Sequence, residues 1–557
     1  MKPSTWAPRA ATVELMTPTA CTAMKPGASG WFFADMDLHD GDRYGFSLDG
    51  GPMRPDPRGR RQPDGVHEMS QWFDVTRFEW GDQLWEDFDL STAILYELHI
   101  GTFSETGTFD GAIAHLDHLA EVGINAVEVM PIASFPGTHG WGYDGVDLFC
   151  VHEPYGGPAG FARFVDACHQ RGLGVVLDVV YNHFGPAGSY LQEFGPYLTD
   201  HHNTPWGNAV NLDDDGSDEV RSFFVDNARM WLRDFHVDGL RLDAVHALVD
   251  DSEKHFLAEL ADAVVGLTAT TNRSAWLIAE SDLNDPRVVL PIDRGGLGIH
   301  AQWSDDFHHA LHVALTGERT GYYERFTGLR DLVDSFDRVF VRAPSAPVPD
   351  ELSGSQFVVY GQNHDQIGNR AQGDRLPDDA KALAIGIVVF SPHIPMLFQG
   401  EEWGATTPFC YFTDHTDQQL ANAVTVGRTQ EFALFGWRPA DVADPQDKAT
   451  FIASKLKWDE AMHPGHADSL KFVRDMIALR RGAPELCNGD RTSCRATCDE
   501  DQGVLWVTRA PYSLVANFSH HERLVQSLGE LAVSSQPLKM LDEGPSIPPR
   551  TVAIFRA

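Results

Sequence analysis

Two charged side chains, Arg241 and Asp243, lie inside the otherwise apolar stretch GLRLDAVH (239–246). Side chains alternate between the two faces of a β-strand, so these two would point the same way. Burying a charge is costly unless the charge is paired or used. Three more apolar stretches are followed by polar residues. The motifs at these ends are DVVYNH (178–183), AES (279–281) and NHD (363–365). The carboxylates at these ends are therefore candidates for a shared site.

The residue types at these ends favour the hydrolysis of glycosides. That reaction needs one carboxylate as nucleophile or base and one protonated carboxyl as acid, about 5 Å apart when configuration is retained. A single acidic strand end is often structural, as a helix N-cap or an ion pair. Several carboxylates crowded into one pocket repel each other, and this cost is hard to explain without a function. We therefore predict a catalytic cleft.

The elements that position these ends begin at about Ile94, where strand-like stretches alternate with helix-like ones such as 109–123 and 160–172. The expected strands are 94–100, 126–132, 174–180, 239–245, 275–281, 300–307, 357–365 and 395–403. This alternation predicts an α/β fold, a (β/α)₈ TIM barrel. The active site of such a barrel lies at the C-terminal ends of its strands.

Short strand-like pieces flank the expected barrel on both sides. We predict an N-terminal β-sandwich of the carbohydrate-binding kind over residues 1–85 and a small C-terminal β-sandwich domain over 484–557. The catalytic barrel would occupy 86–483, with a short inserted segment at about 181–238 that adds structure over the barrel mouth.

The composition is globular with a strongly acidic balance. Of 557 residues, 43% are hydrophobic and 22% charged, and the net charge is −37. Such a charge disfavours nucleic acid and anionic membrane as partners and is compatible with a neutral ligand. The N-terminus lacks the apolar core of a signal peptide, and the 7 cysteines are sparse, so we predict reduced thiols and a cytoplasmic protein.

Taken together in this order, the four strand-end motifs resemble the signature regions of the α-amylase family, and the barrel with two flanking β-domains fits the same family. The resemblance implies that Asp243 is the nucleophile of a covalent glycosyl-enzyme mechanism. Glu280 would be the general acid and then the general base. Asp365 would bind sugar hydroxyls and stabilise the transition state.

The same resemblance assigns residues that hold the sugar to be cleaved. Arg241 would pair with the nucleophile and keep it ionised. His183 and His364 would hydrogen-bond this sugar, and Tyr143 would stack beneath it. After the nucleophile, amylases often carry Lys-His, where this chain has His246 and Ala247. Those positions bind sugar on the leaving side, so plain starch cleavage is not expected.

No metal or other cofactor is predicted. The acidic run NLDDDGSDE (211–219) faintly resembles a calcium loop, but its twelfth position is Ser222, where such a loop needs a bidentate glutamate. We expect instead that Ser217 caps the next helix, with Asp218 and Glu219 in its first turn.

Longer segments resemble one branch of that family, the trehalohydrolases. They include 94–112, WSDDFHHALHVALTGERTGYY (303–323), 398–415 and GRTQEF (427–432). The branch hydrolyses the α-1,4 bond next to the terminal trehalose of a maltooligosyl trehalose, and it pairs functionally with the enzyme that makes this substrate. Candidate leaving-side residues are Trp141, Asp305, Asp306, His308, His309, Glu401, Glu402 and Trp403. Core packing stays open as an alternative for His309 and Trp403, and orientation of a neighbouring group for Glu402.

Two alternatives remain open at this point. A glucan branching or debranching enzyme shares the catalytic residues and the N-terminal domain, and its products would distinguish it. A non-catalytic glycan-binding protein is less compatible with the sequence, because a binder has no need of a proton donor beside a nucleophile. A phosphate-processing enzyme is disfavoured by the charge and by the lack of a glycine-rich phosphate loop.

Overall fold

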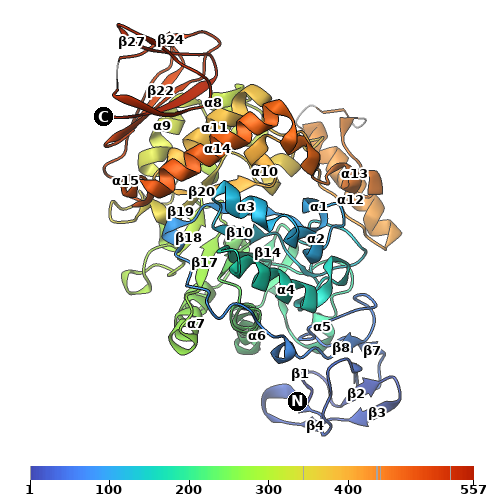
Figure 1. The fold of residues 1–557 in the computed structure, drawn as a ribbon. Coiled ribbons are helices and arrows are strands. Elements are labelled where there is room, and N and C mark those ends of the chain that lie inside the picture. Colours follow the sequence, from blue (N-terminus) through green and yellow to red (C-terminus); the bar gives the residue numbers. More distant parts are fainter. Residues whose placement is uncertain (1, 343, 435–436, 439–440, 527) are drawn as a thin grey trace.

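The chain is described by a computed structural model that covers residues 2–342, 344–434, 437–438, 441–526 and 528–557 (Figure 1). Eight parallel strands close into a barrel, as predicted. They are β9 (Leu95–Leu98), β10 (Ala126–Val129), β13 (Gly174–Val179), β16 (Gly239–Leu242), β17 (Trp276–Ala279), β18 (Ala301–Trp303), β19 (Phe357–Tyr360) and β20 (Ile394–Phe398). Every neighbouring pair is parallel, and β20 closes the ring against β9.

The strands fill the barrel with one apolar layer and, above it, one polar layer. Leu95, Ala126 and Val176 belong to the apolar cluster inside the barrel. Two residues further along the same strands, on the same inward face, lie Glu97, Glu128 and Asp178. The register places Glu97 beside Glu128 and Asp178 beside Arg241. Arg241, which the sequence analysis singled out, thus lies with these carboxyl side chains just beneath the C-terminal mouth of the barrel.

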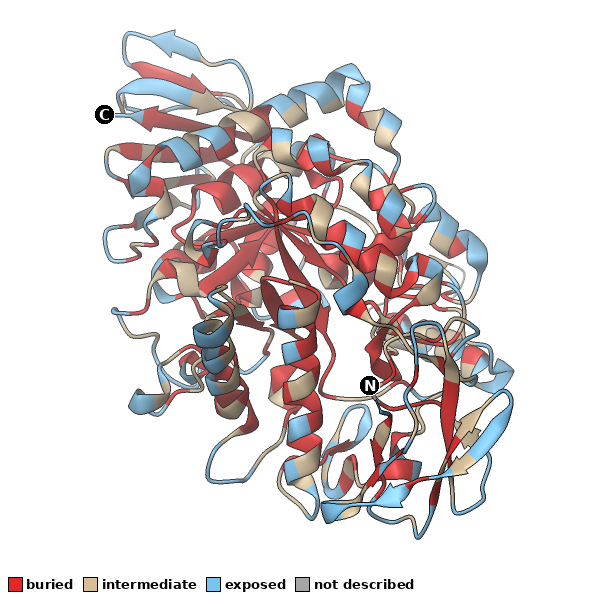
Figure 2. Ribbon diagram, turned by 60° about the horizontal axis from the view of Figure 1, so that its bottom comes forward, coloured by how far each residue is buried: buried red, intermediate tan, exposed pale blue. Residues whose placement is uncertain are grey.

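Helices surround the barrel, and Figure 2 shows its buried strands inside a ring of helices that expose their outer faces. The ring includes α3 (Leu116–Val122), α4 (Gly157–His169), α6 (Ser217–Arg229), α7 (Phe256–Thr271), α8 (Asp305–Thr316), α11 (Asp378–Phe390) and α14 (Pro464–Gly482). Within the described residues, no helix has the length and apolarity needed to cross a membrane.

Additional sheets lie at opposite ends of the molecule (Figure 1). The N-terminal ones contain β1 (Ser4–Trp6), β2 (Val13–Thr17), β3 (Ala20–Ala23), β4 (Lys25–Pro26), β5 (Trp31–Phe33), β6 (Arg43–Leu48), β7 (Met53–Arg54) and β8 (Ser70–Gln71). The C-terminal ones contain β21 (Arg495–Asp499), β22 (Val504–Arg509), β23 (Tyr512–Asn517), β24 (Arg523–Leu524), β25 (Glu530–Ser534), β26 (Lys539–Leu541), β27 (Gly544–Ile547) and β28 (Thr551–Arg556). The exact limits of the domains stay predictions.

Local differences from the predicted elements affect the site. The stretches expected as strands at 300–307 and 357–365 stop at Trp303 and Tyr360, and the helices α8 and α10 (His364–Gly368) begin within them. The inserted segment forms a hairpin of β14 (Leu198–Thr204) and β15 (Gly207–Val210) before α6. The prediction that Ser217 caps α6 is wrong, because Gly216 occupies the N-cap; Asp218 and Glu219 do lie in the first turn.

Candidate active site

A cleft of about 950 Å³ opens where the loops leave the C-terminal ends of the barrel strands. Most of the side chains predicted to bind or cleave substrate line it. They are Trp141, Tyr143, His183, Asp243, His246, Glu280, Asp305, Asp306, His309, His364 and Asp365. Arg241 is fully buried directly beneath this surface.

Arg241 joins the carboxylates at the floor of the cleft. Its Nη1 donates to both oxygens of Asp178, at 3.0 and 2.8 Å, and to Oδ1 of Asp243 at 2.7 Å. Its Nη2 lies 3.2 Å from Oε2 of Glu280. The second oxygen of Asp243 accepts a hydrogen bond of 2.7 Å from Asn182 Nδ2. These bonds hold Asp243 in one orientation at the floor of the cleft, and they pair the two charges at this strand end with each other.

Glu280 is a carboxyl whose surroundings favour the protonated form. Burial raises its pKa well above the ordinary value, and the nearby carboxylates of Asp243, Asp365 and Asp305 raise it further, against the opposing effect of Arg241. One of its oxygens accepts a hydrogen bond of 2.6 Å from the backbone N–H of Ala244. Glu280 therefore has the protonation state that a general acid needs.

Asp365, His364 and Tyr143 form the wall beside the nucleophile. Asp365 is the most open of the catalytic candidates, with 37% of its side chain exposed, so its carboxylate is available to ligand hydroxyls. His364 is buried, and its Nε2 lies 2.8 Å from the hydroxyl of Tyr143. Tyr143 donates that hydroxyl proton to Asp178 at 2.7 Å. Tyr143 lines the cleft, and the hydrogen bonds of its hydroxyl to Asp178 and His364 fix the position of its ring.

The inserted hairpin contributes an aromatic side chain that the sequence analysis missed. Trp206, in the turn between β14 and β15, stacks on His183 with ring centroids 5.0 Å apart and an interplanar angle of 3°. Its side chain is half exposed and lines the cleft. The Nε2 of His183 bonds to the backbone oxygen of Tyr143 at 3.0 Å. In the sequence, a tryptophan within the polar turn TPWGN (204–208) could have indicated an aromatic side chain exposed for binding.

The first turns of α8 supply polar groups on the other side of the cleft. Tyr360 donates its hydroxyl to Asp305, and burial raises the pKa of Asp305 to about 7. Asp306 accepts the backbone N–H groups of Val341 and Arg342 at 2.6 and 2.7 Å. Asp306 thereby holds the segment that brings Arg342 to the cleft.

Four predicted leaving-side residues lie elsewhere. His308 points from α8 toward the barrel, where its ring nitrogens bond to Gly361 O and Tyr323 Oη at 2.9 and 3.2 Å. After β20, the chain turns at Gly400 (φ 81°) into the short helix η11 (Glu401–Trp403). Glu401 accepts the N–H of Phe398.

The rest of η11 packs between the barrel and α3. Glu402 accepts from the hydroxyl of Tyr96 at 3.1 Å and bonds His118 at 3.0 Å. Trp403 is fully buried and its ring centroid is 4.8 Å from that of Trp458. The prediction that Glu401, Glu402 and Trp403 line the cleft is therefore corrected: they support the barrel from outside.

Further cleft residues come from segments whose roles were not assigned from the sequence. They are Asp282, Asn284, Tyr322, Glu324, Arg325, Phe326, Arg342, Gln366, Asn369, Tyr411 and Arg428. Tyr322 and Arg428 belong to the segments 303–323 and 427–432 that were already singled out, so the segments carried a signal although the individual residues did not.

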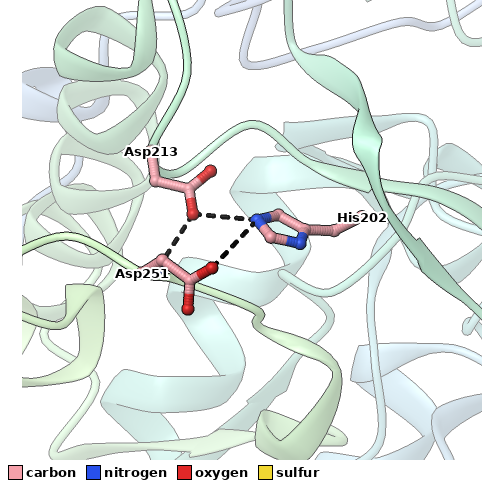
Figure 3. Close-up of side chains that lie close together, drawn as sticks. All are labelled: His202, Asp213 and Asp251. Carbon is pink, nitrogen blue, oxygen red and sulfur yellow. Dashed lines mark hydrogen bonds and ion pairs between the residues drawn. The ribbon is translucent and has the colours of Figure 1, made fainter.

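One group of described residues places metal-ligand atom types close together, away from the cleft. His202, Asp213 and Asp251 offer atoms within 4.8 Å of one another (Figure 3). The Oδ2 of Asp213 already bonds His202 Nε2 at 2.9 Å and the backbone N–H of Asp251 at 2.8 Å, and Asp251 is exposed. These bonds tie the hairpin to the loop after β16. The prediction of no metal stays a prediction.

Comparisons with known proteins agree with this geometry. A family model for the alpha amylase catalytic domain matches residues 83–205. The malto-oligosyltrehalose trehalohydrolase of Arthrobacter ramosus is 45% identical over 97% of this chain and 98% of its own length. That of Mycobacterium tuberculosis is 43% identical over 99% and 98%. A crystal structure described as a putative alpha amylase from Salmonella typhimurium superposes with a TM-score of 0.91 at 35% identity, covering 100% of this chain and 97% of that one.

These relatives match the chain from the N-terminal sheets to the C-terminal sheets and are not confined to the barrel. The similarity therefore covers the flanking sheets as well as the barrel. The chain belongs to the malto-oligosyltrehalose trehalohydrolase family and is a glycoside hydrolase of the alpha-amylase type.

Proposed function

We propose that this enzyme hydrolyses the α-1,4 bond next to the terminal trehalose of a maltooligosyl trehalose and releases trehalose. Relatives named malto-oligosyltrehalose trehalohydrolase, 43% and 45% identical over nearly the whole chain, support this substrate. The observation that carries the hydrolysis is the shared contact of Asp243 and Glu280 with Arg241 at the floor of a large cleft. This contact places Asp243, which is ion-paired with Arg241, beside Glu280, whose pKa is raised by burial, on neighbouring strand ends. Glycoside hydrolysis requires such a pair of carboxyls.

Each carboxyl has one part in the reaction. Asp243 attacks the anomeric carbon while Glu280 gives its proton to the departing glycosidic oxygen, so free trehalose leaves. Glu280 then takes a proton from water, which hydrolyses the glycosyl-enzyme with retained configuration. Asp365 binds hydroxyls of the reacting sugar, and Tyr143 supports the ring from below.

The leaving side has the residue types that recognise a disaccharide with many hydroxyls. Polar side chains from the start of α8 and from the segments after β17 and β18 line one part of the cleft. They are Asp282, Asn284, Asp305, His309 and Arg342. A site of paired polar groups rejects a ligand that leaves them without partners, so a maltose unit in place of trehalose would bind less well.

A product assay tests this function. The protein is incubated separately with maltotriosyl trehalose, maltopentaose and glycogen, and the sugars are separated. We expect trehalose and maltotriose from the first substrate and little action on the other two. Cleavage or branching of glycogen without release of trehalose would leave the catalytic carboxyls in place and refute the substrate, in favour of a branching or debranching enzyme.

A cytoplasmic location and a functional pairing with the enzyme that makes maltooligosyl trehalose are part of the same proposal. All seven cysteines are free thiols, which is compatible with a reducing compartment. The charge of −37 gives no support to nucleic acid or an anionic membrane as a partner.

A further inference from the structure

Glu97, at the inner face of β9, holds His364 with both of its carboxylate oxygens. Oε2 accepts the backbone N–H of His364 at 2.8 Å, and Oε1 bonds the ring nitrogen Nδ1. Both side chains are almost completely buried, with 1% exposed. A buried carboxylate that clamps the backbone and the ring of one residue fixes the position of that residue and its proton.

The hydrogen bonds continue from His364 to the proposed nucleophile. The Nε2 of His364 bonds Tyr143, Tyr143 donates to Asp178, and Asp178 accepts from Arg241, which also donates to Asp243. Because the hydroxyl proton of Tyr143 goes to Asp178, its oxygen can only accept from His364. Because Glu97 is a carboxylate, Nδ1 also donates. Both ring nitrogens of His364 therefore carry protons, and the ring is an imidazolium.

We infer that Glu97 is a positioning residue for the hydrolysis: it keeps His364 doubly protonated, so that His364 holds Tyr143 against Asp178 and places a positive charge beside Asp365. The inference rests on the proposed roles of Asp243 and Asp365. Neither residue is touched by Glu97 itself. Glu97 acts through His364, whose Nε2 lies 3.6 Å from Oδ1 of Asp365.

The charged and titratable groups around His364 agree with this state. Burial would lower its pKa, but the carboxylates of Glu97 and Asp365 outweigh burial and raise the pKa to about 9. Arg241 opposes them. The groups that face the ring from the surrounding elements are Glu97, His99, Glu128, Tyr143, Asp178, Arg241 and Asp365.

Glu128 is a matched control on the neighbouring strand. It stands opposite Glu97 in the register, points to the same barrel interior and is equally buried. Neither of its oxygens has a hydrogen-bond partner among the described residues, and burial raises its pKa well above the ordinary value. A protonated glutamate is close in shape and charge to glutamine, so Glu128→Gln should change the activity little. Glu97→Gln, in contrast, removes a carboxylate and one of its two acceptor oxygens for His364.

The test compares the pH dependence of kcat and of kcat/KM for wild type, Glu97→Gln and Glu128→Gln. We expect Glu97→Gln to lower kcat at neutral pH by about 10- to 100-fold with little change in KM. The sugar still binds, but it is misplaced relative to the catalytic carboxyls. Without the Glu97 carboxylate, the pKa of the buried His364 falls into the acid part of the assay range, because burial lowers it and Glu97 no longer raises it. The loss should therefore be smaller at acid pH, where the ring regains its proton, and larger as pH rises. Wild type and Glu128→Gln should share one profile.

A double-mutant comparison distinguishes an effect of Glu97 through His364 from a general loss of stability in Glu97→Gln. In a His364→Asn background there is no ring to protonate, so adding Glu97→Gln should change neither kcat nor the pH profile. A further loss of more than threefold in that background, or an equal shift in Glu128→Gln, would overturn the inference. The proposed substrate fails separately: if wild type releases no trehalose but cleaves maltopentaose, the same variants are compared on maltopentaose.

Discussion

Replacement of Asp243 by alanine should separate catalysis from folding. The change removes two hydrogen bonds of 2.7 Å, one from Arg241 and one from Asn182. Bonds to a charged group contribute about 1.5–3 kcal/mol each. The loss is offset because Arg241 keeps Asp178 and Glu280 as partners, and because Asp243 raises the pKa of both, so its removal relieves repulsion. We therefore expect the free energy of unfolding to fall by about 2 kcal/mol or less.

The activity should fall far more than the stability. Without the nucleophile no glycosyl-enzyme forms, and the rate of trehalose release from maltotriosyl trehalose should drop by a factor on the order of 10⁴ or more. The matched control is Asp110→Ala, which breaks an exposed aspartate–arginine pair with Arg163, and neither of these residues lines the cleft. That pair contributes about 1 kcal/mol or less, and the control should keep full activity. Activity of Asp243→Ala within 100-fold of wild type, or a Tm lowered much further than that of the control, would refute the assignment.

Three other replacements test the remaining parts of the site. For Glu280→Gln we expect kcat/KM to fall about 10²- to 10⁴-fold and to lose its decline at high pH, because that decline reports deprotonation of the general acid. If kcat/KM of the variant still declined at high pH, the decline would belong to another group. For Trp206→Ala we expect a higher KM for maltotriosyl trehalose and a kcat within about threefold of wild type, because the indole lines the cleft beside His183 rather than beside the reacting carboxyls. An unchanged KM would show that Trp206 does not bind substrate. For Arg241→Lys we expect the free energy of unfolding to fall by about 3 kcal/mol or more, because one ammonium cannot bind Asp178, Asp243 and Glu280 at once. Denaturant titration measures this change. Wild-type stability would contradict the role of Arg241 in holding all three carboxyls.

Strand periodicity was sufficient to predict the barrel and the floor of the cleft. Asp243 and Glu280 follow strands directly, so the direction of the strand determines where their side chains point. The same rule, applied to the stretches 94–100 and 126–132, would also have identified Glu97 and Glu128, which are charges inside apolar strands like Arg241. Glu97 was missed because it occurs in no motif of the strand ends.

Predictions beyond a strand end were less successful, for geometric reasons. The run after Trp303 is a helix, in which adjacent residues point about 100° apart, so Asp305 and His309 share the cleft face and His308 does not. At the end of β20, the left-handed turn at Gly400 redirects the chain, and the side chains of 401–403 then face the outer layer. Neither change of direction is encoded in the alternation of apolar and polar residues.

The arrangement of charges also explains why the floor of this cleft suits its reaction. Glu280 is held protonated by burial and contributes no charge. Two buried cations, Arg241 and His364, face the carboxylates of Glu97, Asp178 and Asp243. Asp365 adds a further carboxylate 3.6 Å from His364 Nε2, so the carboxylates outnumber these two cations beneath the sugar. The transition state of glycoside hydrolysis is an oxocarbenium-like cation, so this surplus stabilises the transition state more than the neutral substrate.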